Sequence, residues 1–330
     1  MPRHTGLMLV SFRENFSDRG AVIGLFLSNK CNFICAHCCT ESSPSKNDIL
    51  PLAVLEEFLN SVSSSDNVKA FHASGGEPFL HPKHLQKISD YAHEHGKLFG
   101  VNTNGYWTNS KLIKKMLAGN ELIGLTHLFI SYSKWHEKFI SIELINEAID
   151  IGISSHKTVE IMIVYESADE LERYQAALTS GRKNLIVMSS PIDYIGRASQ
   201  LQPADRSVQK DMAYSACNEA NRPTLLSNGD FIACCNTVSY SAGNNGLQLG
   251  SAMIKSGDQL LREYTQSFHF KAIAQLGPQL VSAILKKTPD KHDNASSDKC
   301  LSCEKLLNTH EGTDISSGLR GSGIIKLINL

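Results

Sequence analysis

The sequence has no surplus of either charge: 32 Lys and Arg residues stand against 33 Asp and Glu residues, a formal net charge of −1. A chain without a basic excess has no broad positive field to hold a phosphate backbone, so nucleic acid is not an expected partner. Apolar runs are short, and Ala21–Leu27 is far below the ~18–20 residues that a membrane-spanning helix needs. Near the start, Leu7–Val10 is too short for the apolar core of a signal peptide. We therefore expect a soluble, cytoplasmic protein that contacts no membrane.

Internal repeats and low-complexity tracts are missing as well. With 42% hydrophobic and 20% charged residues, the composition is that of an ordinary globular protein, which excludes a disordered, collagen-like or coiled-coil chain. The 330 residues suit either two domains of about 150 residues or one α/β barrel of roughly 200–250 residues with an appendage.

Cysteine is the residue whose number and spacing say most about function. Nine are present, and an odd count at clustered spacings in a chain that is not secreted argues against a disulfide framework. Short spacings hold thiolates close enough to share one metal ion or cluster. Two metal centres are therefore expected. The cysteines are Cys31, Cys35, Cys38, Cys39, Cys217, Cys234, Cys235, Cys300 and Cys303.

Short β-branched apolar runs alternate with amphipathic stretches between the first and second cysteine groups. This repeated strand–helix pattern predicts an α/β fold with a parallel sheet, in which six strands curl into a partial (β/α)6 TIM-like barrel. In such barrels the chemistry occurs at the carboxyl ends of the strands, directly after which Cys31, Gly75, Asn104 and Ser133 fall. The expected strands are 22–27, 68–73, 98–103, 127–132, 159–164 and 185–188, and the expected helices include 52–62, 83–95, 109–118 and 142–151.

The pattern changes after about residue 205. Asn228-Gly229 between two apolar runs predicts a hairpin. Helical spacing returns over 260–264 and 270–287, with an interruption at Gly277-Pro278. The tail over 312–323 is rich in Gly and Ser, which favours a mobile segment. We therefore divide the chain into a barrel domain, residues 1–205, and a smaller C-terminal iron–sulfur domain with its tail, residues 206–330.

Cys31, Cys35 and Cys38 place three thiols within eight residues, directly after the first expected strand. Such a loop can bind three irons of a 4Fe-4S cluster and leave the fourth iron open to a substrate. A structural zinc site completed by His37 is the alternative that spacing alone leaves open. After the second strand comes the segment Ser74–Pro78, whose glycine pair lets backbone approach a ligand closely and whose Glu presents a carboxylate.

Together, the Cys-x3-Cys-x2-Cys loop and the GGEP segment closely resemble the radical S-adenosylmethionine (SAM) superfamily, over roughly residues 22–198. The resemblance implies that SAM binds the open iron and is cleaved by one electron to methionine and a 5'-deoxyadenosyl radical. Ser133 and Lys134 depart from the family, in which an acidic residue is frequent at this point. The implied cofactor contacts are Gly75, Gly76 and Glu77 at the ammonium group, Asn104 at methionine or ribose, Ser131 at ribose, and Arg197 at the adenine and carboxylate edge.

Five further cysteines lie beyond the barrel, and four thiolates suffice for a complete 4Fe-4S cluster. A zinc ribbon would use a similar geometry and is the alternative. The arrangement resembles the short auxiliary-cluster domains, called SPASM or twitch, of radical SAM enzymes that act on ribosomally made peptides. The resemblance implies an auxiliary 4Fe-4S cluster bound by Cys217, Cys234, Cys300 and Cys303.

This ligand set leaves over one thiol of the adjacent pair Cys234-Cys235. Consecutive residues on a strand face opposite sides, so Cys234 can bind iron while Cys235 faces the barrel mouth; the alternative is that both are structural. The overall pattern is similar to small radical SAM peptide epimerases. In those enzymes a radical removes the α-hydrogen of an L-residue and a thiol, here that of Cys235, returns hydrogen to the opposite face. The implied partners are a precursor peptide and an electron donor such as flavodoxin or ferredoxin.

Two other functions are compatible with these residues. A peptide cross-linking enzyme would form a thioether or carbon–carbon bond by oxidising the substrate radical through the auxiliary cluster, without a thiol donor. An iron–sulfur electron carrier or zinc-bound scaffold would have no use for the GGEP segment. Product mass separates the two enzymatic readings, because inversion preserves the mass and a cross-link removes two hydrogens.

Overall fold

The barrel is built from six parallel strands. The computed structural model describes residues 20–62, 65–182, 185–201, 216–234, 246–286 and 299–322. Within these residues the strand order is β6-β5-β4-β3-β2-β1-β7-β8-β9, and β1 to β6 all run parallel. The predicted α/β fold is confirmed, because each expected strand overlaps an observed one. The strands are β1 (Val22–Phe26), β2 (Ala70–Ser74), β3 (Leu98–Thr103), β4 (His127–Tyr132), β5 (Thr158–Tyr165) and β6 (Ile186–Pro191).

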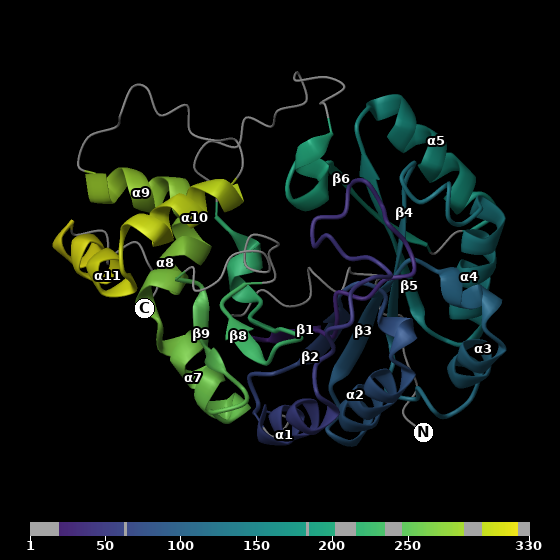
Figure 1. The fold of residues 1–330 in the computed structure, drawn as a ribbon, viewed down its shortest axis with the longest axis horizontal. Coiled ribbons are helices and arrows are strands. Elements are labelled where there is room, and N and C mark those ends of the chain that lie inside the picture. Colours follow the sequence, from purple (N-terminus) through teal and green to yellow (C-terminus); the bar gives the residue numbers. More distant parts are fainter. Residues whose placement is uncertain are drawn as a thin grey trace.

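One helix joins each pair of successive strands along the outside of the curved sheet (Figure 1). Ser110, Ser141 and Ser167 begin three of these helices, each accepting a hydrogen bond from a backbone N–H of the first turn. The joining helices are α1 (Leu52–Val62), α2 (Pro82–Glu94), α3 (Lys111–Ala118), α4 (Ile142–Ser154) and α5 (Ala168–Thr179). Short 3-10 helices follow β2, β3 and β6: η1 (Pro78–Leu80), η2 (Tyr106–Asn109) and η3 (Gly196–Gln200).

Strand residues alternate between two environments, as a period of two requires. Leu25, Phe71 and Ile161 are fully buried in the main hydrophobic core. Their neighbours Phe26 and Met162 face the other way and line a cavity inside the barrel. Alternate residues of the same strands therefore form the hydrophobic core and the lining of the cavity.

The second half of the chain extends the same sheet. β7 (Thr224–Leu225) pairs in parallel with β1, and β8 (Asp230–Ile232) and β9 (Gln248–Ser251) then add antiparallel strands. The predicted hairpin is present, since β7 and β8 flank Asn228 and Gly229, and Gly229 has a φ of +84° that favours glycine. The proposed boundary near residue 205 lies outside the described residues, so the division into two domains stays a prediction.

Helices gather on the far side of β9 (Figure 1). The predicted interruption is present, because Gly277 ends one helix with a φ of +78° and Pro278 begins the next. The predicted mobile tail is wrong over most of its length. Residues 312–321 form a helix that buries Ile315 and Leu319, one turn apart, and this burial outweighs the poor helix propensity of Gly and Ser. The elements are η5 (Asn218–Asn221), α7 (Gly257–Gln266), α8 (Phe268–Leu276), α9 (Pro278–Lys286), α10 (Lys299–Thr309) and α11 (Gly312–Gly321).

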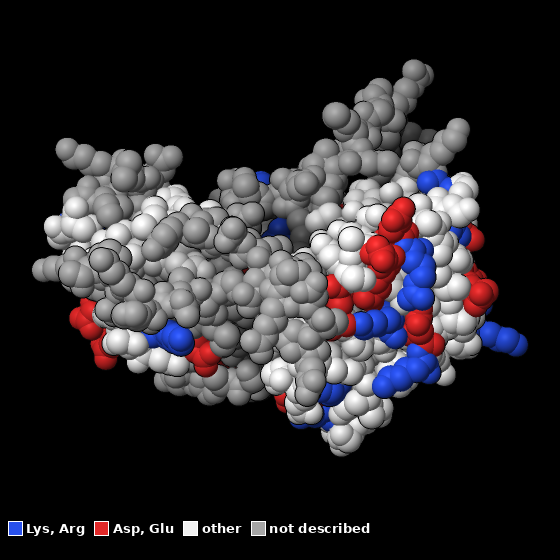
Figure 2. All heavy atoms as spheres, turned by 90° about the horizontal axis from the view of Figure 1, so that it is seen from above, with Lys and Arg blue, Asp and Glu red and all other residues white. Residues whose placement is uncertain are grey.

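Charged side chains of opposite sign are interleaved on the surface of the barrel helices (Figure 2). Ion pairs join Lys114 to Glu147, and Arg182 to Asp150. Among the described residues, no helix combines the length and apolar character needed to cross a bilayer.

Candidate active site

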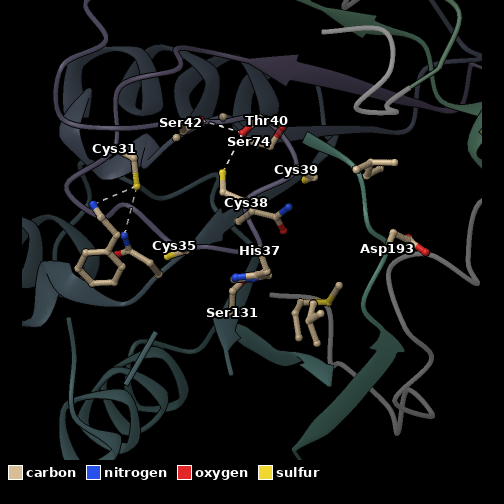
Figure 3. Close-up of a pocket in the computed structure, with 18 of the residues that line it drawn as sticks. Cys31, Cys35, His37, Cys38, Cys39, Thr40, Ser42, Ser74, Ser131 and Asp193 are labelled. Carbon is tan, nitrogen blue, oxygen red and sulfur yellow. Dashed lines mark hydrogen bonds between the residues drawn. The ribbon is translucent and has the colours of Figure 1, made fainter. Parts of the chain in front are cut away.

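A cavity of about 570 Å³ opens at the carboxyl ends of the barrel strands (Figure 3). Its wall combines the cysteine loop after β1 with the residues that end β2 to β6, and Glu219 and Cys300 reach it from the second half of the chain. Of the predicted site residues, the cavity brings together Cys31, Cys35, Cys38, Gly75, Gly76, Asn104, Ser131 and Cys300.

The thiols of the cysteine loop lie close enough to affect one another. Cys31 and Cys35 are buried, and this burial raises the pKa of each thiol to about 12, with smaller contributions from neighbouring thiols. Cys38 N–H donates to the Cys35 carbonyl at 3.1 Å, which closes the turn between the second and third thiol. At neutral pH these thiols are protonated, so any metal that binds them must displace protons.

The predicted zinc alternative needs Cys31, Cys35, Cys38 and His37 to converge on one point. In the described part of the chain, no group of three or more His, Cys, Asp or Glu side chains is arranged to hold a metal ion. His37 instead stacks on Trp135, with ring centroids 4.6 Å apart. A 4Fe-4S cluster binds each thiolate to a different iron, so its ligands need not converge in this way.

The glycine pair after β2 packs directly against the cysteine loop. Gly76 N–H donates to the Ser28 carbonyl at 2.7 Å, and a Cβ on Gly76 would lie 2.1 Å from the carbonyl oxygen of Lys30. Gly75 has a φ of +137°, where a side chain is strained. Only glycines let this turn reach both the loop and the cavity, as the sequence predicts.

Glu77 is placed differently from its predicted contact. Its carboxylate is buried and accepts hydrogen bonds from Phe79 N–H, the Thr103 hydroxyl and Asn104 N–H, at 2.8–3.0 Å. Burial raises the pKa of Glu77 to about 7 against the opposing effect of these donors. The carboxylate ties the turn after β2 to the end of β3, and it is not among the cavity-lining residues. Its predicted contact with the SAM ammonium group stays a prediction.

Arg197 contacts the backbone of the cysteine loop, and its predicted cofactor contact stays a prediction. The guanidinium donates to the carbonyls of Cys35 and Ser42, both at 2.8 Å, and the Arg197 N–H donates to the Cys38 carbonyl at 3.0 Å. The preceding Gly196 packs so closely that a Cβ there would lie 2.2 Å from the Cys39 carbonyl oxygen. Arg197 thus holds the cysteine loop through three backbone carbonyls, and it is not among the residues that line the cavity.

Asp48 is a residue that sequence analysis missed. Its carboxylate accepts hydrogen bonds from Asn29 N–H, at 2.9 Å, and from the Ser227 hydroxyl, at 2.6 Å. Burial alone would raise the pKa of Asp48, but these donors outweigh it and lower the pKa. The contact joins the cysteine loop to the β7–β8 hairpin, and no sequence pattern marks residues so far apart as partners.

The second group of thiols converges on a small hollow beyond the main cavity. Cys217 precedes η5, Cys234 follows β8, and Cys300 and Cys303 lie one turn apart on α10. Burial raises the pKa of Cys303 well above its usual value, and the nearby thiols of Cys234, Cys217 and Cys300 raise it further. Glu219 and Cys300 line both spaces, so the hollow of the second thiol group lies next to the main cavity. Cys235 lies outside the described residues, and its predicted role stays a prediction.

The cysteine loop and strands β2 to β5 lie in the segment that matches a known family. Residues 25–177 match the model of the radical SAM superfamily. "Putative peptide biosynthesis protein YydG" of Bacillus subtilis (strain 168) is 23% identical over 129 residues, 39% of this chain and 40% of the relative. "Antilisterial bacteriocin subtilosin biosynthesis protein AlbA" of the same organism is 36% identical over 81 residues, 24% of this chain and 17% of the relative.

A solved structure shares the fold over most of the chain. The structure of native anSMEcpe with bound AdoMet and Cp18Cys peptide aligns with a TM-score of 0.53 at 13% identity, covering 92% of this chain and 99% of that one. This likeness concerns the fold alone, while the curated relatives above are matched over less than half of their length. The family match and the thiol-lined barrel agree that residues 25–177 form a radical SAM domain.

Proposed function

We propose that the chain is a radical SAM enzyme that inverts a residue of a ribosomally made peptide from the L to the D configuration. The observation that carries the proposal is the convergence of Cys217, Cys234, Cys300 and Cys303 beside the barrel cavity. Four thiols complete the ligand set of an auxiliary 4Fe-4S cluster. Cys235 is then free to act on the substrate.

The cysteine loop fits a SAM-binding 4Fe-4S cluster in its donor chemistry. Cys31, Cys35 and Cys38 supply three thiols to one cavity. Phe33 N–H and the Asn104 amide both donate to the Cys31 sulfur. Such a concentration of N–H donors suits the negative charge of thiolates and sulfides. When bound, the cluster and SAM supply a 5'-deoxyadenosyl radical, which removes hydrogen from carbon.

The remaining residues position the cofactor and substrate. Gly75 and Gly76 offer close approach of backbone, and Asn104 and Ser131 offer polar groups on the same wall. The substrate α-carbon would lie between this wall and the second thiol group, near Cys300, which borders both spaces.

Cys235 completes the inversion in the proposed reaction. Loss of the α-hydrogen leaves a carbon radical, and the Cys235 S–H bond breaks to give that carbon a hydrogen atom on the opposite face. The resulting thiyl radical regains one electron and one proton, and the cleavage of SAM consumes another electron. The peptide itself is neither oxidised nor reduced, so both electrons come from an external donor of the flavodoxin or ferredoxin class.

The relatives support a peptide as the substrate. YydG and AlbA are described as proteins of peptide and bacteriocin biosynthesis, and the structure that shares the fold holds a bound peptide. A second function, cross-linking of a peptide through a thioether or carbon–carbon bond, is favoured by the same four thiols. An auxiliary cluster beside the cavity could accept an electron from the substrate radical.

The test first seeks a short precursor peptide among the neighbouring genes and then incubates it with the chain anaerobically, with SAM and a reductant in deuterated water. We expect one residue to become a D-residue and to carry one deuterium at its α-carbon. Cys235→Ala should still form 5'-deoxyadenosine but give no D-residue. Cys39→Ala, which removes a different thiol from the cavity wall, is the matched control and should stay active. A product lighter by two hydrogens would favour cross-linking, and an active Cys235→Ala variant would disprove the proposed donor.

A further inference from the structure

Two N–H groups donate hydrogen bonds to the sulfur of Cys31. Phe33 N–H donates to Sγ with a nitrogen–sulfur distance of 3.4 Å, and Asn104 Nδ2 donates to the same sulfur at 3.8 Å. The Cys31 thiol in turn donates to Asn32 Oδ1 at 3.9 Å. Cys38, by contrast, shares a hydrogen bond with the Thr40 hydroxyl at 3.5 Å, a group that can donate or accept. The Cys31 sulfur is thus the thiol of the loop with amide donors around it.

Asn104 is held so that its amide nitrogen faces the sulfur. The side-chain oxygen accepts a hydrogen bond from Tyr106 N–H at 3.0 Å, which fixes the orientation of the amide because a backbone N–H can only donate. The second hydrogen of Nδ2 is donated to Asn32 Oδ1 at 2.9 Å, and Asn104 N–H donates to Glu77 at 2.8 Å. With an exposure of 7%, the side chain has little freedom to turn away.

We propose that Asn104 sets the reduction potential of the cluster bound through Cys31. A hydrogen bond to a ligand sulfur stabilises negative charge there, and the reduced cluster carries one more negative charge than the oxidised one. The donor therefore raises the potential. It eases reduction by the external electron donor and moderates the cluster's power to reduce the SAM sulfonium. This inference rests on the cluster of the proposed function, and it does not depend on the peptide or on Cys235.

Asn104 is a positioning residue, and a purely structural role is the alternative. Its oxygen caps the turn that ends in Tyr106, so a disruptive substitution would damage the loop without testing the potential. Asn104→Ser separates the two roles. A serine oxygen can still accept from the N–H two residues on, but the shorter side chain has no amide to offer the sulfur. Thr103→Val is the matched control, because Thr103 bonds Glu77 and the Gly105 N–H beside the same turn without contacting the sulfur.

The experiment is an EPR-monitored redox titration of the full chain after anaerobic reconstitution with iron and sulfide. A parallel sample with SAM identifies the first cluster as the one whose signal changes. We expect Asn104→Ser to lower the potential of this cluster at unchanged iron content, and Thr103→Val to leave it at the wild-type value. Equal potentials in Asn104→Ser and wild type, or an equal shift in Thr103→Val, would overturn the proposal.

A second measurement covers the case in which Asn104→Ser does not bind the cluster. Wild-type chain labelled with ¹⁵N-asparagine should show a ¹⁵N coupling to the reduced first cluster in pulsed EPR, and absence of that coupling would also refute the inference. Because neither measurement uses peptide, failure of epimerisation leaves this result intact. A chain that binds no iron at all would overturn both proposals.

Discussion

The two thiol groups are built in opposite ways. Cys31, Cys35 and Cys38 come from one short loop, whereas the second group is collected from the start of η5, the end of β8 and helix α10. The first group can therefore be recognised from its spacing in the sequence. The conformation of its loop, however, depends on hydrogen bonds from residues far away in sequence, such as Arg197. The second group needs the whole C-terminal half to be folded before its thiols meet. A site whose ligands come from one loop can be identified from sequence. A site whose ligands come from several elements is identified only once the fold shows that they meet.

The two thiol groups also differ in the polarity of the side chains and backbone groups around them. The first sulfur, that of Cys31, receives hydrogen bonds from Phe33 and Asn104. The second group shares its hollow with apolar side chains, among them Leu247, Phe270 and Ile273. Hydrogen bonds to sulfur raise a cluster's potential, while an apolar wall disfavours added negative charge. In the proposed function, this difference suits the first group to passing an electron to SAM and the second to a place beside the substrate.

Removing one thiol from each group gives the largest expected effect. Cys31→Ala should abolish 5'-deoxyadenosine formation, because the cluster whose open iron would bind SAM loses one of its three ligands. Cys303→Ala should keep SAM cleavage and lose product formation. Each variant should bind roughly half of the wild-type iron if both groups hold a 4Fe-4S cluster. Iron analysis and chromatography of 5'-deoxyadenosine measure both outcomes.

Loss of SAM cleavage in Cys303→Ala at unchanged thermal stability would contradict separate roles for the two thiol groups. The two groups would then form one functional unit. Cys39→Ala controls for the removal of a thiol as such, since Cys39 lies beside the loop but outside its spacing.

The next effect concerns the close packing that holds the first group. Gly76→Ala places a Cβ 2.1 Å from the Lys30 carbonyl oxygen, where backbone must shift to make room. We expect a loss of about 2–3 kcal/mol in the free energy of unfolding, measured by urea denaturation of the metal-free chain. Gly321→Ala is the control, because a Cβ there meets nothing within 4 Å. An unchanged Gly76→Ala midpoint would show that the loop is not held by this contact.

Sequence alone predicted most of the barrel, because each of its six strands is a short apolar run bounded by turn residues. It also predicted the break at Gly277-Pro278, where a left-handed φ and a missing N–H act locally. Helix α11 escaped prediction because its stability comes from burying Ile315 and Leu319 against other helices. Local propensity carries no information on that packing.

The site shows the same limit at the level of single side chains. Glu77 and Arg197 both bond to protein backbone that the sequence did not identify as their partner, and their predicted cofactor contacts stay predictions. A motif predicts that a carboxylate or guanidinium is needed near a loop. It does not say which of several nearby polar groups the side chain reaches, because that depends on distances set by the whole barrel.

A smaller effect tests the clamp on the first group. Arg197→Gln removes the charged fork that donates to the Cys35 and Ser42 carbonyls, and hydrogen bonds from charged groups contribute roughly 1.5–3 kcal/mol. In the metal-free chain we expect alkylation of Cys35 and Cys38 to accelerate about tenfold or more, as measured by mass spectrometry. Arg197→Lys should lie between, because lysine keeps the charge but not the fork.

Cys303 is the internal reference for this experiment, since it belongs to the second group and does not touch the clamp. Its alkylation rate should stay at the wild-type value in both variants. Acceleration at Cys303 equal to that at Cys35 would mean that Arg197 stabilises the whole molecule and not the loop.

The smallest expected effect is a loss of folding stability at low pH caused by a histidine in the barrel. Burial lowers the pKa of His127, on β4, from 6.5 to about 4, so the folded state favours the neutral ring. A pKa lowered by folding contributes stability that is complete above about pH 6.5 and is lost as the pH falls towards 4. At pH 5.5 this loss amounts to about 1 kcal/mol for one histidine. His127→Gln cannot gain a proton in this range, so its stability should fall less between pH 7.5 and 5.5 than that of the wild type, as measured by urea denaturation. Equal losses in both proteins would assign the acid sensitivity to the other histidines whose pKa values burial lowers, which are His37, His81 and His136.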